Sequence, residues 1–319
     1  MFWNSTKWDP NGQHVYITGG SSGLGLALAK IVASKGAHVS IVARNEKNLA
    51  TASTEIEACR VSSDQIFQSF SHSLLEAAGA TAALEDVISK HSGLAPDAVF
   101  LCAGSSNPRY FLEYTPSDLS SGMDQAYWVQ TYTAHAVTKL MVSQNRTGHI
   151  TFVSSTLGLM TIPGYASYVP GKHALRGLAD MLRQEFLLYG IEVHIFFPPT
   201  MFTKGYEEEN KLKPKLTLKI EEGDDGLTAE QAADILFKGV QKGNFQITGN
   251  FITDLFRVSS RQASPRHNWI LDGLLDFVAY IAVPVWATGM EKQVRAHREE
   301  HLKHLEDGGF VEFQKQSTK

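Results

Sequence analysis

The chain has 319 residues, of which 43% are hydrophobic and 19% are charged, enough for one large or two small domains with a full core. Its net charge of −4 gives no reason to propose nucleic acid as a partner. Its two cysteines, Cys59 and Cys102, could pair, but Cys102 lies in an apolar run typical of a central strand. We therefore expect two reduced thiols and a cytosol-facing location.

A glycine-rich turn near the N-terminus connects a predicted strand at 15–17 to an alanine- and leucine-rich helical stretch. In such a turn, backbone N–H groups approach a phosphate without hindrance from a Cβ atom, and the helix dipole favours the anion. The turn therefore predicts a nucleotide site, and its candidate binding residues are Gly19, Ser21, Ser22, Gly23, Leu24 and Gly25.

Strand-like and helix-like segments alternate along the rest of the first 250 residues. The remaining strands are predicted at 39–43, 65–70, 98–102, 149–153, 192–197 and 245–248. Continuous apolar strands with helical crossovers indicate a parallel sheet covered on both faces. The sequence thus predicts an α/β fold: a Rossmann-type doubly wound sheet of about seven strands in one domain, 10–260, with a hydrophobic C-terminal extension, 261–319.

The second predicted strand runs directly into Arg44. An acidic residue at this place would bind a ribose 2′-hydroxyl, whereas an arginine offers a fork of donors suited to a 2′-phosphate. We therefore expect NADPH, although an ordinary surface arginine is the alternative.

A set of three polar residues follows the fifth predicted strand. Ser155 ends the strand, and Tyr168, 13 residues later, is followed by Lys172 four residues on. This spacing places the tyrosine and the lysine on one face of a helix. Because Pro170 is tolerated only in a first turn, Tyr168 should begin that helix, with Ser167 as a possible cap.

Charge alone predicts that Lys172 activates Tyr168. A free tyrosine, with a pKa of about 10, is a poor acid–base catalyst at neutral pH. An ammonium about 4.5 Å away, at an effective dielectric constant near 20, favours the phenolate by about 3.7 kcal/mol. We therefore expect the pKa of Tyr168 to lie near neutrality.

The G-x-x-x-G-x-G spacing of the turn and the Ser–Tyr–Lys set together resemble the short-chain dehydrogenase/reductase family over residues 12–250. The resemblance implies that Tyr168 donates a proton, that Ser155 binds the substrate oxygen and that Lys172 also holds the nicotinamide ribose. Further cofactor contacts that it implies come from Ala103, Gly104, Tyr168, Pro198 and Thr203. It also implies a homodimer or homotetramer, and no metal site is expected.

Three departures from the family pattern concern the cofactor site and the proton relay. Only the Ala-Gly end of the family's N-N-A-G motif is present, and 71–74 has no aspartate for the adenine. The helix after the fourth strand has no asparagine at 123–127. Gln125 is the candidate substitute for that proton-relay residue.

Two segments interrupt the alternation of strands and helices. Residues 204–226 are dense in charge, and their place after the sixth strand favours a mobile lid over an ordinary solvated loop. Residues 269–290 could span a bilayer by length, but Asp272 and Asp276 would each cost about 2.5–3.5 kcal/mol near its centre. A segment at the membrane surface, or a re-entrant one, fits better, with a buried interface helix as the alternative.

Aromatic residues at 269, 280 and 286 suit a headgroup region, and the charged stretch 291–306 predicts a solvated tail helix.

A closer resemblance, to the 3-ketodihydrosphingosine reductase branch of the family, rests on residues 164–168, 198–205 and 207–214. It implies NADPH-dependent reduction of a long-chain amino ketone at the cytosolic face of the endoplasmic reticulum membrane.

Under that resemblance, Glu207, Glu208 and Glu209 could attract the substrate ammonium, although a solvated charge run explains them equally well. Two other functions stay open. One is a membrane-bound dehydrogenase for a steroid, retinoid or other lipid ketone. The other is a catalytically silent nucleotide-binding scaffold.

Overall fold

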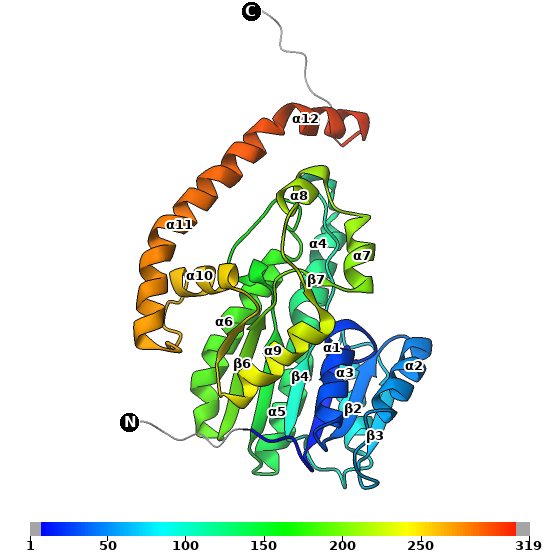
Figure 1. Ribbon diagram of the computed structural model, residues 1–319. Helices are drawn as coiled ribbons and strands as arrows, with labels where there is room; N and C mark the ends of the chain where they lie inside the picture. The colour runs from blue at the N-terminus through cyan, green and yellow to red at the C-terminus, as the bar shows by residue number, and fades with distance from the viewer. Residues whose placement is uncertain (1–7, 311–319) are drawn as a thin grey trace, which may run out of the picture.

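The structure is a computed structural model that describes residues 8–310. Its main sheet has seven parallel strands in the order β3-β2-β1-β4-β5-β6-β9 (Figure 1). The strands are β1 (His14–Thr18), β2 (His38–Ala43), β3 (Phe67–Ser71), β4 (Ala98–Leu101), β5 (Gly148–Val153), β6 (Ile191–Phe197) and β9 (Gln246–Thr248). The predicted doubly wound sheet is confirmed, and each predicted strand lies within about two residues of an observed one.

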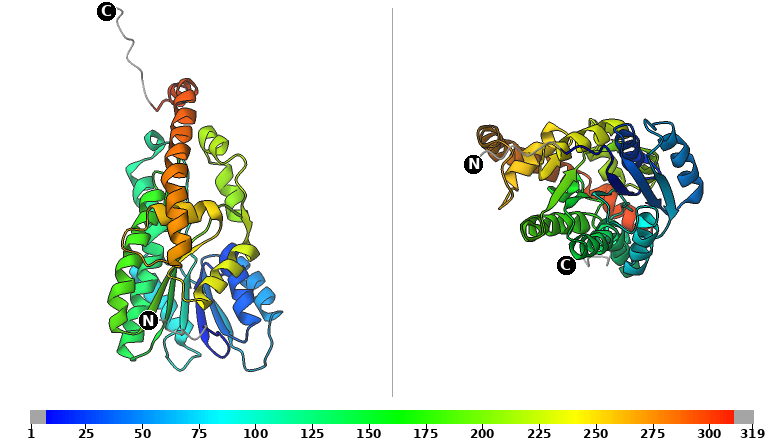
Figure 2. Two further views of the ribbon diagram at one scale, coloured as in Figure 1. Left: turned by 60° about the vertical axis from the view of Figure 1, so that its left-hand side comes forward. Right: turned by 90° about the horizontal axis from the view of Figure 1, so that it is seen from below.

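Helices cover both faces of this sheet (Figure 2, right). On one face pack α1 (Gly23–Ala33), α2 (Glu46–Glu57) and α9 (Ala229–Gln241), and on the other α3 (Ala77–Ile88), α5 (Val129–Ser143) and α6 (Val169–Glu185). In β1, Val15 and Ile17 belong to the core beneath α1, α2 and α9, and Tyr16 belongs to the core beneath α3, α5 and α6. This alternation arises because successive strand side chains point to opposite faces of the sheet. The continuous apolar strands of the sequence therefore reflect burial on both sides.

Short elements lie at the carboxyl ends of the strands. They are η1 (Phe111–Glu113), α4 (Pro116–Met123), the π-helix η2 (Asp124–Trp128), η3 (Thr156–Gly158), β7 (Met201–Phe202) and β8 (Leu227–Thr228). At the opposite edge, η4 (Phe186–Leu188) joins α6 to the start of β6. The predicted lid segment, 204–226, contains two helices, α7 (Lys204–Asn210) and α8 (Lys215–Ile220). Leu216 and Thr217 of α8 are buried, so this segment is packed onto the domain despite its high charge.

After β9, the domain ends with α10 (Phe251–Ser259), and the C-terminal extension, 261–319, forms α11 (Trp269–Ala296) and α12 (Arg298–Asp307). The long helix α11 runs as a rod beside the domain, and α12 lies beyond α8 (Figures 1 and 2). The prediction of a solvated tail helix needs correction, because Leu305 is buried and His304 lies 2.5 Å from a Glu113 oxygen. One face of α12 is therefore packed on the domain.

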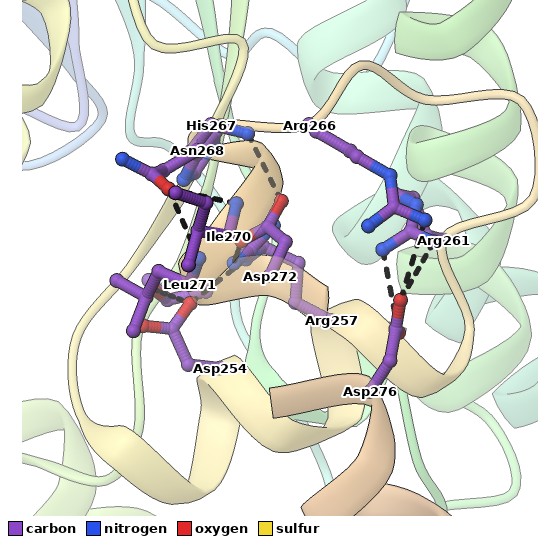
Figure 3. A network of polar contacts seen from close by, with 11 residues as sticks. Asp254, Arg257, Arg261, Arg266, His267, Asn268, Ile270, Leu271, Asp272 and Asp276 are labelled. Carbon is purple, nitrogen blue, oxygen red and sulfur yellow. Dashed lines mark hydrogen bonds and ion pairs between the residues drawn. The ribbon is translucent and has the colours of Figure 1, made fainter. Parts of the chain in front are cut away.

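A polar network fixes the start of α11 to α10 and the loop after it (Figure 3). Asp272 faces Arg257, with 2.8 Å between a carboxylate oxygen and Nη2, and both side chains are almost fully buried. Asp276 lies 2.9 Å from Arg261 and 3.6 Å from Arg266. The two carboxylates that count against a bilayer span in the sequence are thus neutralised within the protein.

Candidate active site

The glycine-rich turn joins β1 to α1 and has no room for side chains at two of its glycines. A Cβ atom at Gly25 would lie 2.4 Å from the Gly19 carbonyl oxygen. A Cβ atom at Gly19, where φ is +68°, would lie 2.9 Å from the backbone nitrogen of Ala103. Glycine is therefore required at both positions, because the backbone approaches itself closely there.

The start of α1 fits a nucleotide phosphate. The Ser22 side chain makes no capping hydrogen bond, and the first turn of α1 contains no acidic residue. Backbone N–H groups, together with the hydroxyls of Ser21 and Ser22, therefore form a donor set for an anion at the positive end of the helix dipole. The turn fits the phosphates of a nicotinamide dinucleotide.

The other predicted cofactor residues lie along the same edge of the sheet. The Gly19 N–H donates to the Val42 carbonyl at 2.8 Å, which places Arg44 just beyond the neighbouring strand end. The Thr18 hydroxyl accepts a hydrogen bond from the Ala103 N–H at 3.1 Å and so holds the Ala103–Gly104 pair beside the turn.

Two more of these residues follow β6. The Pro198 carbonyl accepts hydrogen bonds from the Thr156 backbone at 2.9 Å and from its hydroxyl at 3.2 Å. Thr203 caps α7, and its methyl carbon would be 3.4 Å from a Cβ atom placed at Gly23. The tertiary structure therefore brings Thr203 to the glycine-rich turn and places Pro198 beside Thr156, which follows Ser155.

The three predicted catalytic residues meet at the carboxyl end of β5. Ser155 follows the strand, and Lys172 reaches back from α6 so that its Nζ donates to the Val153 carbonyl at 2.9 Å. The Lys172 Nζ lies 5.3 Å from the centroid of the Tyr168 ring. The predicted cap Ser167 is wrong by one residue, because α6 starts at Val169 and Tyr168 itself occupies the N-cap position.

The ionisation of this set differs from the charge-only prediction. Burial raises the pKa of Tyr168 above its ordinary value, the Glu209 carboxylate raises it further, and a hydrogen bond with Ser155 acts in the opposite direction. Burial also lowers the pKa of Lys172 to about 7. The prediction of a Tyr168 pKa near neutrality omitted desolvation, which is the largest effect on this pKa. In this structure Tyr168 is a protonated phenol at neutral pH.

Gln125 does not take the place of the proton-relay asparagine through its side chain. That side chain accepts a hydrogen bond from Ser105 and donates to Ser121 at 2.8 Å. Only its backbone oxygen approaches the site, 3.1 Å from where a Gly104 Cβ atom would lie, with the Lys172 Nζ 3.7 Å from the same point.

Gln130, which the sequence analysis missed, is the buried polar residue beside Lys172. Its amide donates to the Val153 carbonyl at 2.8 Å and accepts from the Val153 N–H at 3.1 Å. The carbonyl that binds Lys172 is therefore also fixed by Gln130. A polar residue four positions from two buried alanines, Ala126 of η2 and Ala134 of α5, is the signal that could have found it.

Of the three lid glutamates, only Glu209 faces inward. Its carboxylate accepts hydrogen bonds from Tyr165 and Ser106. Glu208 instead pairs with Lys211 at 2.6 Å on the exposed side of α7. The sequence predicted that all three glutamates could attract a substrate ammonium, but in the structure only Glu209 is placed to do so.

Three ligand-type side chains also gather at the opposite, amino-terminal end of β5 and β6. His149 Nδ1 lies 3.2 Å from His194 Nε2, and Glu192 lies 3.7 Å from His149. His194 Nδ1 donates to the Asn244 carbonyl at 2.8 Å, and burial lowers the pKa of both histidines to about 4. A hydrogen bond between two neutral imidazoles accounts for this arrangement.

The sequence matches described proteins over most of its length. Residues 13–213 match the model of the short chain dehydrogenase family. A 3-ketodihydrosphingosine reductase from Cryptococcus neoformans is 43% identical over 97% of this chain and 92% of its own. A 3-dehydrosphinganine reductase from Danio rerio is 36% identical over 78% of this chain and 74% of its own.

Solved structures support the fold. A short-chain dehydrogenase/reductase from Burkholderia phymatum in complex with NAD superimposes with a TM-score of 0.68 at 18% identity, covering 76% of this chain and 90% of that chain. Levodione reductase superimposes with a TM-score of 0.66 at 18% identity, covering 75% and 96%. At these identities the likeness concerns the fold alone.

Proposed function

The chain belongs to the short-chain dehydrogenase family, and from this premise we propose that it reduces the 3-keto group of 3-ketodihydrosphingosine to a hydroxyl, giving dihydrosphingosine. The observation that carries the proposal is the meeting of Ser155, Tyr168 and Lys172 beside the glycine-rich turn. The named relatives, which match over 97% and 78% of this chain, supply the choice of substrate.

Each member of the proposed catalytic set has one task. The Ser155 hydroxyl and the Tyr168 phenol hydrogen-bond the substrate carbonyl oxygen, and they stabilise the negative charge that develops there. Tyr168, kept protonated by burial, then gives its proton to that oxygen. Lys172, held by the Val153 carbonyl, orients the nicotinamide ribose. When bound, NADPH supplies the hydride.

The test of the proposed function is oxidation of NADPH by the purified full-length chain with synthetic 3-ketodihydrosphingosine in detergent micelles. We expect turnover with this ketone and much less with steroid or retinal substrates. Equal or better turnover with a steroid or retinoid would support the rival lipid dehydrogenase. No turnover with any ketone would favour the silent scaffold, which the complete catalytic set argues against.

NADPH rather than NADH is proposed because Arg44, exposed at the end of β2, makes no ion pair with any residue in the range 8–310. Replacing Arg44 with alanine should raise KM for NADPH roughly tenfold or more, since a hydrogen bond to a charged group contributes about 1.5–3 kcal/mol. KM for NADH should change little. Steady-state kinetics with both cofactors measures this, and a wild-type preference for NADH contradicts the assignment.

We also propose that α11 binds a membrane surface. Within the described residues, α11 alone is long and apolar enough to cross a membrane, and most of it is not buried. Phe277 and Tyr280 are 69% and 81% exposed. Both ends of α11 contact the same domain, through Asp272–Arg257 at its start and His297–Tyr110 at its end. This favours a helix lying on the bilayer over one that crosses it.

One of the three aromatic residues expected at the lipid headgroups, Trp286, faces the domain instead. Its ring packs edge-on against Phe256, with 4.9 Å between the ring centroids, and so it anchors α11 to the domain. Trp269 and Tyr280 remain exposed.

The location proposed for the protein is the cytosolic face of the endoplasmic reticulum membrane, to which the free thiols of Cys59 and Cys102 are suited. The homodimer or homotetramer stays a prediction.

Phe277→Glu combined with Tyr280→Glu should lower binding to phosphatidylcholine vesicles at least tenfold, because each large side chain loses about 1.5–3 kcal/mol of apolar transfer. Co-sedimentation of full-length protein with vesicles measures the change. Leu187→Glu, at an exposed apolar position outside α11, is the matched control and should bind like wild type. Equal losses in both variants would show that α11 is not the contact.

A further inference from the structure

A mixed-charge cluster lies where the lid meets the active site. The Tyr165 hydroxyl is 2.6 Å from a Glu209 oxygen and 3.0 Å from a Glu221 oxygen. Lys213 lies 2.5 Å from Glu221 and 3.4 Å from Glu209. Ser106, from the loop after β4, donates to the second oxygen of Glu209. We call these five residues the Glu209 cluster.

The Glu209 cluster has more negative than positive charge. Two carboxylates at −1 and one ammonium at +1 leave a formal charge of −1. The Lys213 side chain is almost fully buried, and its ammonium lies nearer to Glu221 than to Glu209. It therefore neutralises mainly Glu221. Glu209 is the more exposed of the two carboxylates, at 22% against 9%. The uncompensated charge is therefore at Glu209, on the open side of the cluster.

A second observation points to a missing donor. The side-chain oxygens of Asn107 and Asn210 are buried and accept no hydrogen bond from the residues that the structure describes. These two residues directly follow Ser106 and Glu209 in the chain. Buried acceptors are normally satisfied, so the segments that carry Ser106 and Glu209 each lack a hydrogen-bond donor. An ammonium group supplies donors as well as positive charge.

The position of the cluster suits an amino group next to the reacting carbonyl. The Tyr165 and Tyr168 rings are 6.1 Å apart between centroids, so Glu209 lies one side chain away from the proposed proton donor. In an α-amino ketone, the nitrogen is about 2.5 Å from the carbonyl carbon, two single bonds away. With its carbonyl held by Tyr168, such a substrate can place its ammonium on the Glu209 side of the site.

We infer that Glu209 binds the protonated amino group of the substrate and selects α-amino ketones over plain long-chain ketones. This inference rests on the proposed function and adds the residue that recognises the head of the substrate. Glu209 is a specificity residue, since the reduction itself requires only Ser155, Tyr168 and Lys172. The ion pair forms in a partly buried site, where charge-assisted hydrogen bonds are strongest.

The experiment compares two ketones of equal chain length in the same detergent micelles, 3-ketodihydrosphingosine and its analogue without the amino group. Wild type should show a kcat/KM at least tenfold higher for the amino ketone. Glu209→Gln should raise KM for the amino ketone about tenfold and leave KM for the analogue nearly unchanged. Glu208→Gln, on the solvent side of the same helix, is the matched control and should leave both values unchanged.

The outcomes separate the two proposals. If wild type oxidises no NADPH with either ketone, the proposed function fails and the inference fails with it. If wild type reduces both ketones equally well, the function stands and the inference is overturned. An equal loss for both ketones in Glu209→Gln also overturns it, because Glu209 would then only fasten the lid. Thermal unfolding of each variant checks that the fold is retained.

Discussion

Tyr168→Phe should lower kcat for ketone reduction by a factor of roughly 10²–10⁴, the usual contribution of a positioned general acid. The substitution removes one hydroxyl and leaves the ring against Lys172, so the packing of α6 should persist. Because Lys172 and the glycine-rich turn are untouched, the Kd for NADPH should change only a few-fold. Single-turnover reduction and fluorescence titration with NADPH measure the two quantities.

Tyr189→Phe is the matched control, since it makes the same chemical change at an exposed position after η4. It should keep wild-type kcat. Full turnover by Tyr168→Phe would mean that another group donates the proton, and the proposed mechanism would be wrong. A loss of cofactor binding equal to the loss of kcat would show that the hydroxyl acts on binding instead.

Arg257→Met should be the most destabilising single change where the C-terminal extension joins the domain, lowering the free energy of unfolding by about 3–5 kcal/mol. Arg257 and Asp272 are 2% and 1% exposed, so the substitution leaves a buried carboxylate without its partner. Arg257 also lies 2.8 Å from Asp254, which fixes its guanidinium within α10. Urea unfolding followed by circular dichroism measures the change.

Arg261→Met, four residues later in the loop after α10, is the matched comparison for the loss of stability (Figure 3). Its partner Asp276 is more exposed, and such pairs usually contribute less than about 1 kcal/mol. The double variant Arg257→Met with Asp272→Leu should regain much of the stability, because it removes the unpaired charge. Equal effects for Arg257→Met and Arg261→Met would contradict a dominant role for the buried pair.

Local patterns predicted the sheet well because most of its strands are buried on both faces and therefore appear as short apolar runs between helices; the partly exposed edge strand β3 gave the weakest pattern. The glycine-rich turn was also predictable, since the backbone geometry at Gly19 and Gly25 excludes other residues and so marks the sequence itself. Residue spacing was enough to place Tyr168 and Lys172 on one turn of α6.

Ionisation and partner choice could not be predicted in this way. The pKa of Tyr168 depends on desolvation and on Glu209, which is 41 residues away in the chain. Gln130 binds the Val153 backbone across the site, and no local pattern specifies that contact. Likewise, the three glutamates at 207–209 look alike in sequence, but the orientation of α7 turns only one of them inward.

The sequence by itself determined the order of strands and helices along the chain, the glycine-rich turn and the residues of the proposed catalytic set, because these follow from backbone geometry and from residues close together in the chain. Only the tertiary structure decided which charges are buried, which are paired and which face the proposed site. Asp272 and Asp276 show the difference: they oppose membrane insertion as isolated charges, yet arginines from α10 and the loop after it neutralise them. Electrostatic energy depends on burial and on distance in space, and neither is contained in a residue's place along the chain.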